Sequence, residues 1–173
     1  VLMTTFVLTV IFDLTIAIEI GLLLAVVLFL KRTSESVEIK HFHDEIDPNQ
    51  ELDIKINTEE KLSIPEGVDV YEIDGPYFFG IANKFEEVMS RISKKPKVRI
   101  IRMRRVPFMD STGIHNLEVL IEQSKKEGVQ IVLSGVNPNV RTALEKAGFT
   151  KIIPTENICS NINVALERSK ELI

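Results

Sequence analysis

The sequence predicts a transmembrane helix followed by an α/β domain, in which helices cover a mostly parallel sheet of four or five strands. Two observations favour this fold class. Residues 1–30 carry only two charged side chains, Asp13 and Glu19, whereas every lysine and arginine lies from Lys31 onward, so the two parts suit lipid and water respectively. In the second part, strand-like and helix-like patterns alternate, which is typical of crossover connections between parallel strands.

Leu14–Leu30 is an apolar stretch with a single charge, and we expect it to be the last helix of a membrane region that covers residues 1–32. At 1.5 Å per residue this helix is about 25 Å long, near the lower limit for crossing a bilayer. Lys31 and Arg32 follow directly, and basic residues that flank a span favour the cytoplasmic side, so the chain after Arg32 is expected in the cytoplasm. Val1–Phe12 is too short to span alone and suggests the end of a preceding membrane helix.

Asp13 and Glu19 are the polar residues expected in the membrane interior. Asp13 can cap the start of the long helix by accepting backbone N–H bonds. A carboxylate in hydrocarbon costs about 2.5–3.5 kcal/mol, so Glu19 is expected to face other helices or a wet cavity. This favours an upstream transmembrane domain as the partner of the segment. Two alternatives stay open: Glu19 reaches the outer interface, or a soluble protein buries residues 14–30 in its own core.

Residues 33–64 are charged and suggest a linker and the start of the cytoplasmic domain. They contain His41 and His43, and two histidines at positions i and i+2 of a strand suit a metal pair. The sequence offers no further Cys or His nearby to complete a ligand set. We therefore interpret the pair as part of a solvated linker, with a turn at residues 47–49.

Residues 65–173 show the periodicities of the predicted domain. The alternation in Val68–Ile73 predicts a half-buried strand, and a Gly-Pro turn joins it to a second strand at Tyr77–Ile81 in a hairpin. Further strands and helices follow, with Gly and Pro signals at helix ends. The later strands are expected at Val98–Met103 and Val129–Leu133, and the helices at Asn83–Ile92, Ser111–Glu127, Pro138–Lys146 and Ile158–Leu172.

The loop that follows the strand at Val98–Met103 is where chemistry is expected. In an open α/β sheet, ligands bind at this strand-to-helix edge. Asp110 or Ser111 can cap the following helix, and the free N–H groups and positive end of that helix favour an anion, or a phosphate on Ser111. Plain capping without chemistry is the alternative.

The motif Asp110-Ser111-Thr112-Gly113, in its order of strand, helix and Gly-Phe elements such as Gly148-Phe149, resembles the STAS domain over about residues 65–173. STAS domains are shared by anti-sigma-factor antagonists and by the C-termini of sulphate permease (SulP) family transporters. In the antagonists the serine directly after the aspartate is phosphorylated, which matches Ser111 here. The resemblance therefore implies a regulatory loop at Asp110, Ser111, Thr112 and Gly113.

Three further segments resemble the transporter branch of this family. Residues 12–21 resemble the start of the last membrane helix, residues 30–32 its inner end, and residues 75–82 the hairpin that opens the transporters' STAS domain. The resemblance implies the cytoplasmic regulatory domain of a secondary active sulphate or related anion transporter, multi-pass in the cell membrane of a bacterium. Implied partners are the upstream transmembrane domain, a second copy in a homodimer, and a cytosolic regulatory protein. A phosphorylation-switched signalling module like the antagonists is the alternative.

A run of basic residues without intervening acids begins at Arg91. Nucleic acid is not expected as a partner, because no aromatic residue lies between Phe85 and Phe108 to stack on bases. Attraction to anionic lipid headgroups is one interpretation, and pairing with acids elsewhere in the fold is the other. The residues expected in a lipid-facing patch are Lys94, Lys95, Lys97, Arg102, Arg104 and Arg105.

Catalysis has no support in the sequence, which contains no Ser/His/Asp arrangement, no phosphate-binding Gly-rich loop and no evident metal cluster. We expect neither an enzyme nor a cofactor. The one cysteine, Cys159, excludes an internal disulfide framework and is typical of a reducing compartment.

Overall fold

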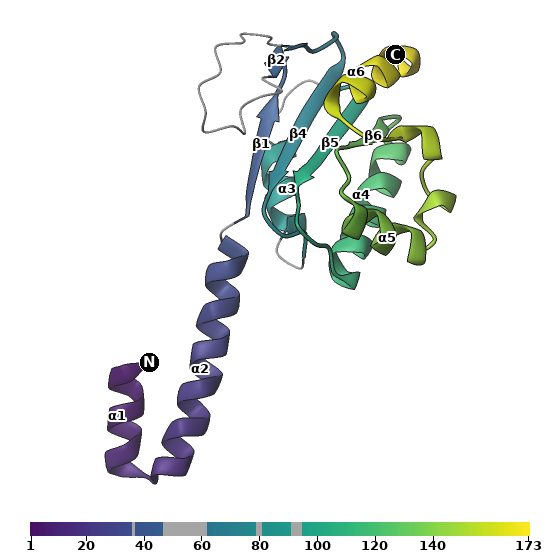
Figure 1. Cartoon of the computed structure of the whole chain (residues 1–173). Coiled ribbons are helices and arrows are strands. Elements are labelled where there is room, and N and C mark those ends of the chain that lie inside the picture. The colour runs from purple at the N-terminus through teal and green to yellow at the C-terminus, as the bar shows by residue number, and fades with distance from the viewer. Residues whose placement is uncertain (36, 47–61, 79–80, 91–94) are drawn as a thin grey trace, which may run out of the picture. The chain divides into compact units, whose positions relative to one another are not determined.

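The computed structural model describes residues 1–35, 37–46, 62–78, 81–90 and 95–173 (Figure 1). The chain divides into two compact units, Val1–Ser36 and Val37–Ile173. We describe each unit by itself.

The first unit is a pair of apolar helices, α1 (Leu2–Ile11) and α2 (Leu14–Glu35). Within α2, Leu14–Arg32 is long and apolar enough to cross a membrane, and most of its large apolar side chains are exposed in the chain by itself. Helix α2 extends past the predicted end at Leu30, because Lys, Arg and Glu are good helix formers even where the apolar run has stopped. The Asp13 carboxylate accepts the N–H of Leu14 at 2.6 Å, at the start of α2 as the sequence suggested.

Small residues allow α1 and α2 to pack closely. Ala17 and Gly21 lie one helical turn apart on α2, and both are buried. A Cβ atom on Gly21 would clash with the Cγ2 atom of Thr5 on α1. Small residues at such spacing are typical of helix pairs in membranes, where close backbone approach supplies the packing energy.

The second unit contains a five-stranded sheet in the order β1-β4-β5-β6-β7. Strand β1 is antiparallel to β4, and the remaining neighbours are parallel, which confirms the predicted α/β class with a mostly parallel sheet. A separate two-stranded sheet pairs β2 with β3. The strands are β1 (Glu38–Phe42), β2 (Glu45–Ile46), β3 (Leu62–Ser63), β4 (Val68–Asp74), β5 (Val98–Arg105), β6 (Gln130–Ser134) and β7 (Ile158–Cys159).

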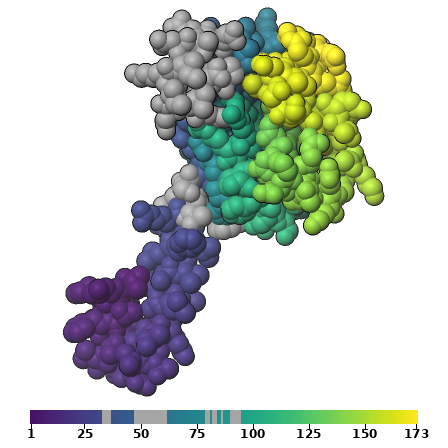
Figure 2. Space-filling view, viewed as in Figure 1, coloured from purple at the N-terminus to yellow at the C-terminus, as the bar shows by residue number. Residues whose placement is uncertain are grey.

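Helices cover both faces of the five-stranded sheet, so a hydrophobic cluster lies on each side of it (Figure 1). Helices α3, α4 and α5 contribute to the cluster that contains Ile73, Ile101 and Leu133. Helix α6, the yellow C-terminal segment of Figure 2, covers Val70 and Ile100 on the opposite face. The helices are α3 (Ile81–Ser90), α4 (Ser111–Lys126), α5 (Pro138–Lys146) and α6 (Ile162–Leu172), with short 3-10 turns at Phe149–Lys151 and Thr155–Asn157.

The predicted hairpin after β4 is wrong. Both edges of β4 are already occupied, by β1 and by β5. Tyr77 makes only an isolated bridge to Met109, and Ile81 begins helix α3; residues 79 and 80 lie outside the described part of the chain. Tyr77, Phe78 and Ile81 pack into the core, which explains the apolar character of these positions.

Three other segments differ from the sequence-based expectation. The segment interpreted as a solvated linker contains β1, which pairs with β4 along its whole length. Ile158 and Cys159, expected to begin the last helix, form strand β7, and the helix starts at Ile162. Strand β4 is also buried on both faces where one exposed face was expected, because α6 covers the second face.

Candidate functional site

The carboxyl ends of β5, β6 and β7 lie at one edge of the parallel sheet, and each leads into a helix that begins there. Strand β5 leads to α4, β6 leads to α5, and β7 leads to α6. Three helix N-termini, each with free backbone N–H groups, are therefore placed along one edge. The sequence motif at residues 110–113 lies at the first of them.

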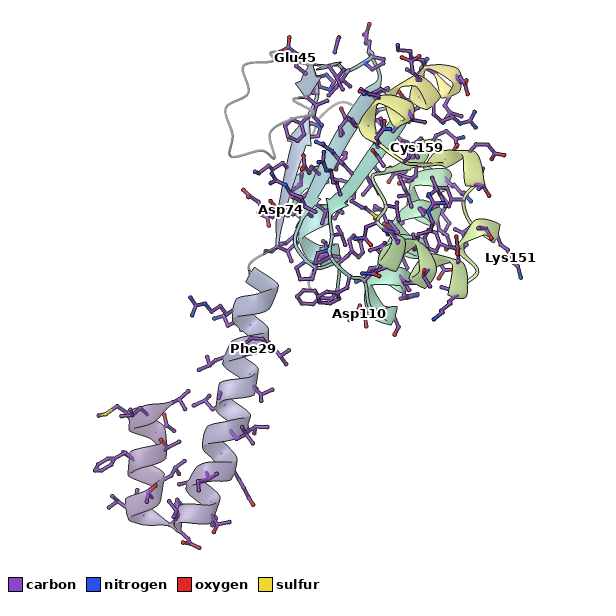
Figure 3. The ribbon with its side chains drawn as sticks, viewed as in Figure 1. Phe29, Glu45, Asp74, Asp110, Lys151 and Cys159 are labelled. Carbon is purple, nitrogen blue, oxygen red and sulfur yellow. The ribbon has the colours of Figure 1, made fainter. Side chains whose placement is uncertain are left out.

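Asp110 is the N-cap of α4 (Figure 3). Its backbone is extended, and its Oδ1 atom accepts the N–H of Gly113 at 2.7 Å. The N–H of Asp110 donates in turn to the carbonyl of Tyr77, so the cap is tied to the segment that precedes α3. Asp110 therefore caps the helix as the sequence suggested. Its carboxylate already accepts a hydrogen bond from one of the N–H groups that would otherwise be available to an anion.

Ser111 and Thr112 are exposed in the first turn of α4, whereas Gly113 is buried. A Cβ atom on Gly113 would clash with the carbonyl oxygen of Tyr77 and would lie 2.9 Å from Cδ1 of its ring. The glycine is therefore required by the close approach of α4 to Tyr77. Burial raises the pKa of the Tyr77 phenol well above its usual range, which reflects how completely this contact excludes water.

A polar cavity of about 520 Å³ lies at the same edge, between the starts of α5 and α6. Arg102 and Arg104 of β5 line it together with Ser134, whose Oγ atom is buried and has no hydrogen-bond partner in the described part of the chain. Asn137 and Asn161, which cap α5 and α6 by accepting the N–H groups of the third helical residues, also line the cavity. Cationic side chains and helix N-termini around one hollow can hold a small anion.

Sequence reasoning missed this cavity, because its lining residues come from three segments that are far apart along the chain, at 102–104, 134–137 and 160–163. The sequence did carry one signal, the Asn137-Pro138 pair, in which an N-cap residue precedes a proline at the first helical position. Asn161 is also a favourable N-cap residue, and recognising it as one would have placed the start of the last helix at Ile162, after β7.

Two arginines of β5, Arg102 and Arg105, form ion pairs with acidic residues of β4. Arg102 is 3% exposed and donates to the buried Glu72 at 3.1 Å. Arg105 donates to Asp74 at 2.7 Å and lies 3.8 Å from Glu72. These contacts match the alternative that the basic residues pair with acids, and Arg102 is not available to a lipid surface.

The other candidates for a lipid-facing patch are spread along β5. Lys95 and Lys97 are exposed just before the strand begins, and Arg104 is exposed near its end. The eight residues of β5 place these two groups roughly 20 Å apart. Lys97 donates to the carbonyl of the C-terminal residue Ile173 at 3.3 Å, and Lys94 lies outside the described residues.

Among protein-family models, that of the STAS domain matches residues 57–165. This chain belongs to the STAS family. The match begins before β3 and ends within α6, so it covers the sheet edge, the Asp110 cap and the cavity.

Known proteins with this STAS domain include transporters. The putative sulfate transporter YvdB of Bacillus subtilis (strain 168) is 34% identical over 154 residues, which is 88% of this chain and 27% of that protein. The chain thus spans about a quarter of the length of this relative. The solved SulP transporter STAS domain from Vibrio cholerae is 38% identical, with a TM-score of 0.56 over 63% of this chain and 85% of that one.

The same fold occurs in a second functional class. An anti-sigma factor antagonist from Mycobacterium paratuberculosis has a TM-score of 0.52 over 77% of this chain and 95% of that one, at 19% identity. This likeness concerns the fold alone.

Proposed function

We propose that this chain supplies the last membrane helix and the regulatory STAS domain of a secondary active transporter for sulfate or a similar anion. The observation that carries the proposal is the joining, in one chain, of a STAS domain to a helix that is long and apolar enough to cross a membrane. Under this proposal the protein is multi-pass in the cell membrane, and residues after Arg32 lie in the cytoplasm. Glu19 then faces an upstream transmembrane domain.

The STAS domain would regulate transport without taking part in the transfer of the anion. A domain can bias a transport cycle only if its contacts differ between two states of the transporter. The sheet edge with the Asp110 cap and the cavity is the surface we assign to such contacts, because its helix starts and Arg104 are accessible there. A second copy of the chain and a cytosolic regulatory protein are the partners proposed for it.

Uptake of labelled sulfate by cells that lack their own sulfate transport tests this function. The full-length protein that contains this chain should restore uptake, and a version that ends after Glu35 should reach the membrane but show an altered maximal rate or apparent affinity. Competition by other small anions identifies the cargo. A full-length protein that is present in the membrane yet transports none of the anions tested would contradict the proposal.

A phosphorylation switch at Ser111 is a second candidate, favoured by the exposure of this serine at a helix N-terminus. Mass spectrometry of the protein from cells should find phosphate on Ser111 under some growth conditions. Ser111→Asp should change transport kinetics, while Thr112→Ala, at the neighbouring exposed position, serves as the control. Ser111 that is unmodified under every condition, with normal kinetics in Ser111→Asp, would leave the residue with no role beyond the first turn of α4.

A further inference from the structure

The histidines that the sequence placed in a linker lie beside a buried carboxylate of the sheet. His41 is in β1, and residues two apart on a strand point to the same face, so His43 follows it on that side. The antiparallel pairing of β1 with β4 brings both imidazoles to Asp69 of β4. The third candidate ligand is therefore an aspartate 26 residues beyond His43, supplied by strand pairing.

The three side chains are within reach of a single metal ion. His43 Nδ1 lies 2.7 Å from Asp69 Oδ1, and His41 Nε2 lies 3.5 Å from the same oxygen. One ligand atom from each residue falls within 4.8 Å of the others. Ligands of a tetrahedral Zn²⁺ ion, at bond lengths of about 2.0–2.1 Å, are roughly 3.4 Å apart, so only small side-chain rotations separate this arrangement from a coordination shell.

Two buried polar atoms of this cluster lack hydrogen-bond partners in the described part of the chain. Asp69 is 1% exposed, and its Oδ2 atom has none; the Nε2 atom of His41 is likewise buried and without one. A buried carboxylate is costly unless a cation or several donors compensate it. A divalent cation would bind both groups at once, and His43, whose side chain is 52% exposed, leaves an entry path from solvent.

Arg99 is the residue of the neighbouring strand β5 that lies in register with Asp69. Its guanidinium donates to Ser124 Oγ at 2.8 Å and lies over the Tyr71 ring, 5.6 Å from the ring centre. Its charge offsets part of the attraction between Asp69 and a metal ion. The site therefore suits an ion that binds imidazole strongly, such as Zn²⁺, better than Mg²⁺ or Ca²⁺, which depend on oxygen ligands and their charge.

We propose that His41, His43 and Asp69 form a Zn²⁺-type metal site, with solvent in the remaining coordination position. The bound ion would link β1 to β4 through side chains in addition to their backbone hydrogen bonds. Because β1 is the first strand after α2 in the chain, metal binding would hold in place the strand that connects the membrane helix to the sheet. The site is separate from the sheet edge assigned to regulation, since it lies toward the amino end of β4.

Zinc titration of the full chain in detergent, after removal of metals with a chelator, tests the proposal by calorimetry. The wild-type chain should bind one equivalent of Zn²⁺. His43→Ala should weaken binding by about 100-fold or more, because losing even an outer-shell partner of a ligand costs 10–100-fold. The matched control is His115→Ala, which removes the third histidine of the sequence at an exposed position on α4 and should leave the affinity unchanged.

Two further measurements separate loss of a ligand from loss of structure. Circular dichroism of metal-free His43→Ala should match the wild type, and His43→Gln, which keeps a polar side chain, should show the same loss of affinity. Cobalt(II) bound to the wild type should give the strong visible absorption of a tetrahedral site, absent in His43→Ala. Equal zinc affinity in the wild type and both His43 variants, or no binding by a folded wild type, would overturn the proposal and leave a hydrogen-bonded His–Asp cluster.

Discussion

Glu72 and Arg102 form an ion pair in the interior of the STAS domain, with side chains 6% and 3% exposed. Breaking a buried ion pair by removing one partner costs about 3–5 kcal/mol, because the remaining charge loses the opposite charge that stabilised it. We expect Glu72→Ala to lower the free energy of unfolding of residues 37–173 by that amount, measured by urea denaturation. Glu167→Ala, which breaks the exposed Lys170–Glu167 pair, should change it by less than about 1 kcal/mol. Equal losses of unfolding free energy in Glu72→Ala and Glu167→Ala would contradict a stabilising role of the buried Glu72–Arg102 pair.

Tyr71 gives the domain a sensitivity to alkaline pH. Burial raises the pKa of its phenol to about 12 from the ordinary value of 10, and the neighbouring Arg99 opposes part of this shift. Because the folded state favours the protonated phenol, its contribution to stability is complete below pH 10 and is lost as the pH rises from about 10 to 12. At about 1.4 kcal/mol per pKa unit, the loss is roughly 2–3 kcal/mol.

Tyr71→Phe should flatten this alkaline loss of stability, because phenylalanine keeps the ring packing and has no proton to lose. Urea unfolding of residues 37–173 at a series of pH values, in parallel for both proteins, measures the difference. Tyr77 is present in both, so its own contribution cancels. Identical pH profiles above pH 10 would show that the Tyr71 phenol is not protected in the folded state.

At the level of elements, the caps of α5 and α6 form a natural comparison. Asn137 and Asn161 each accept the N–H of the third helical residue, but the amide of Asn137 also donates to the carbonyl of Val106. Loss of an N-cap costs about 1 kcal/mol. Asn161→Ala should therefore cost about 1 kcal/mol of unfolding free energy, and Asn137→Ala roughly 1–2 kcal/mol more, because it leaves a part-buried carbonyl unpaired. A smaller loss of unfolding free energy in Asn137→Ala than in Asn161→Ala would show that the hydrogen bond from Asn137 to Val106 does not stabilise the fold.

The elements that sequence reasoning located are those with a clear period or a clear end signal. Strands β4 and β5 and helix α4 follow this rule, and the Asp110 cap was recognised from its position after an apolar strand. Strand β1 was missed because it lies at a sheet edge and three of its five residues, Glu38, Lys40 and His41, are polar, which leaves no clear apolar pattern. Strand β7 was missed because it has only two residues, too few to show an alternation of apolar and polar side chains. The cavity and the His–Asp cluster depend on strand order, which no local pattern reveals.

At the scale of the whole molecule, the two hydrophobic clusters of the STAS domain draw, among the residues that the structure describes, on Val37 and later residues only. Residues 37–173 should therefore fold without the membrane helices, as shown by a cooperative thermal transition in buffer without detergent. A fragment of residues 65–173, the extent that the family resemblance alone suggests, lacks β1 together with Val37 and Ile46, both buried. It should unfold at a lower temperature; an equal transition temperature would show that β1 contributes nothing to stability.

Under the proposed function, copies of this chain are concentrated in the plane of a membrane, and the strand order has a consequence there. A sheet edge with free backbone groups invites strand addition by a neighbouring copy, and hence aggregation. Here one edge is β1, whose Glu38 and Lys40 are charged, and the other is β7, which is only two residues long. Neither edge offers a long, uncharged template, so crowded copies can lie close together without their sheets fusing.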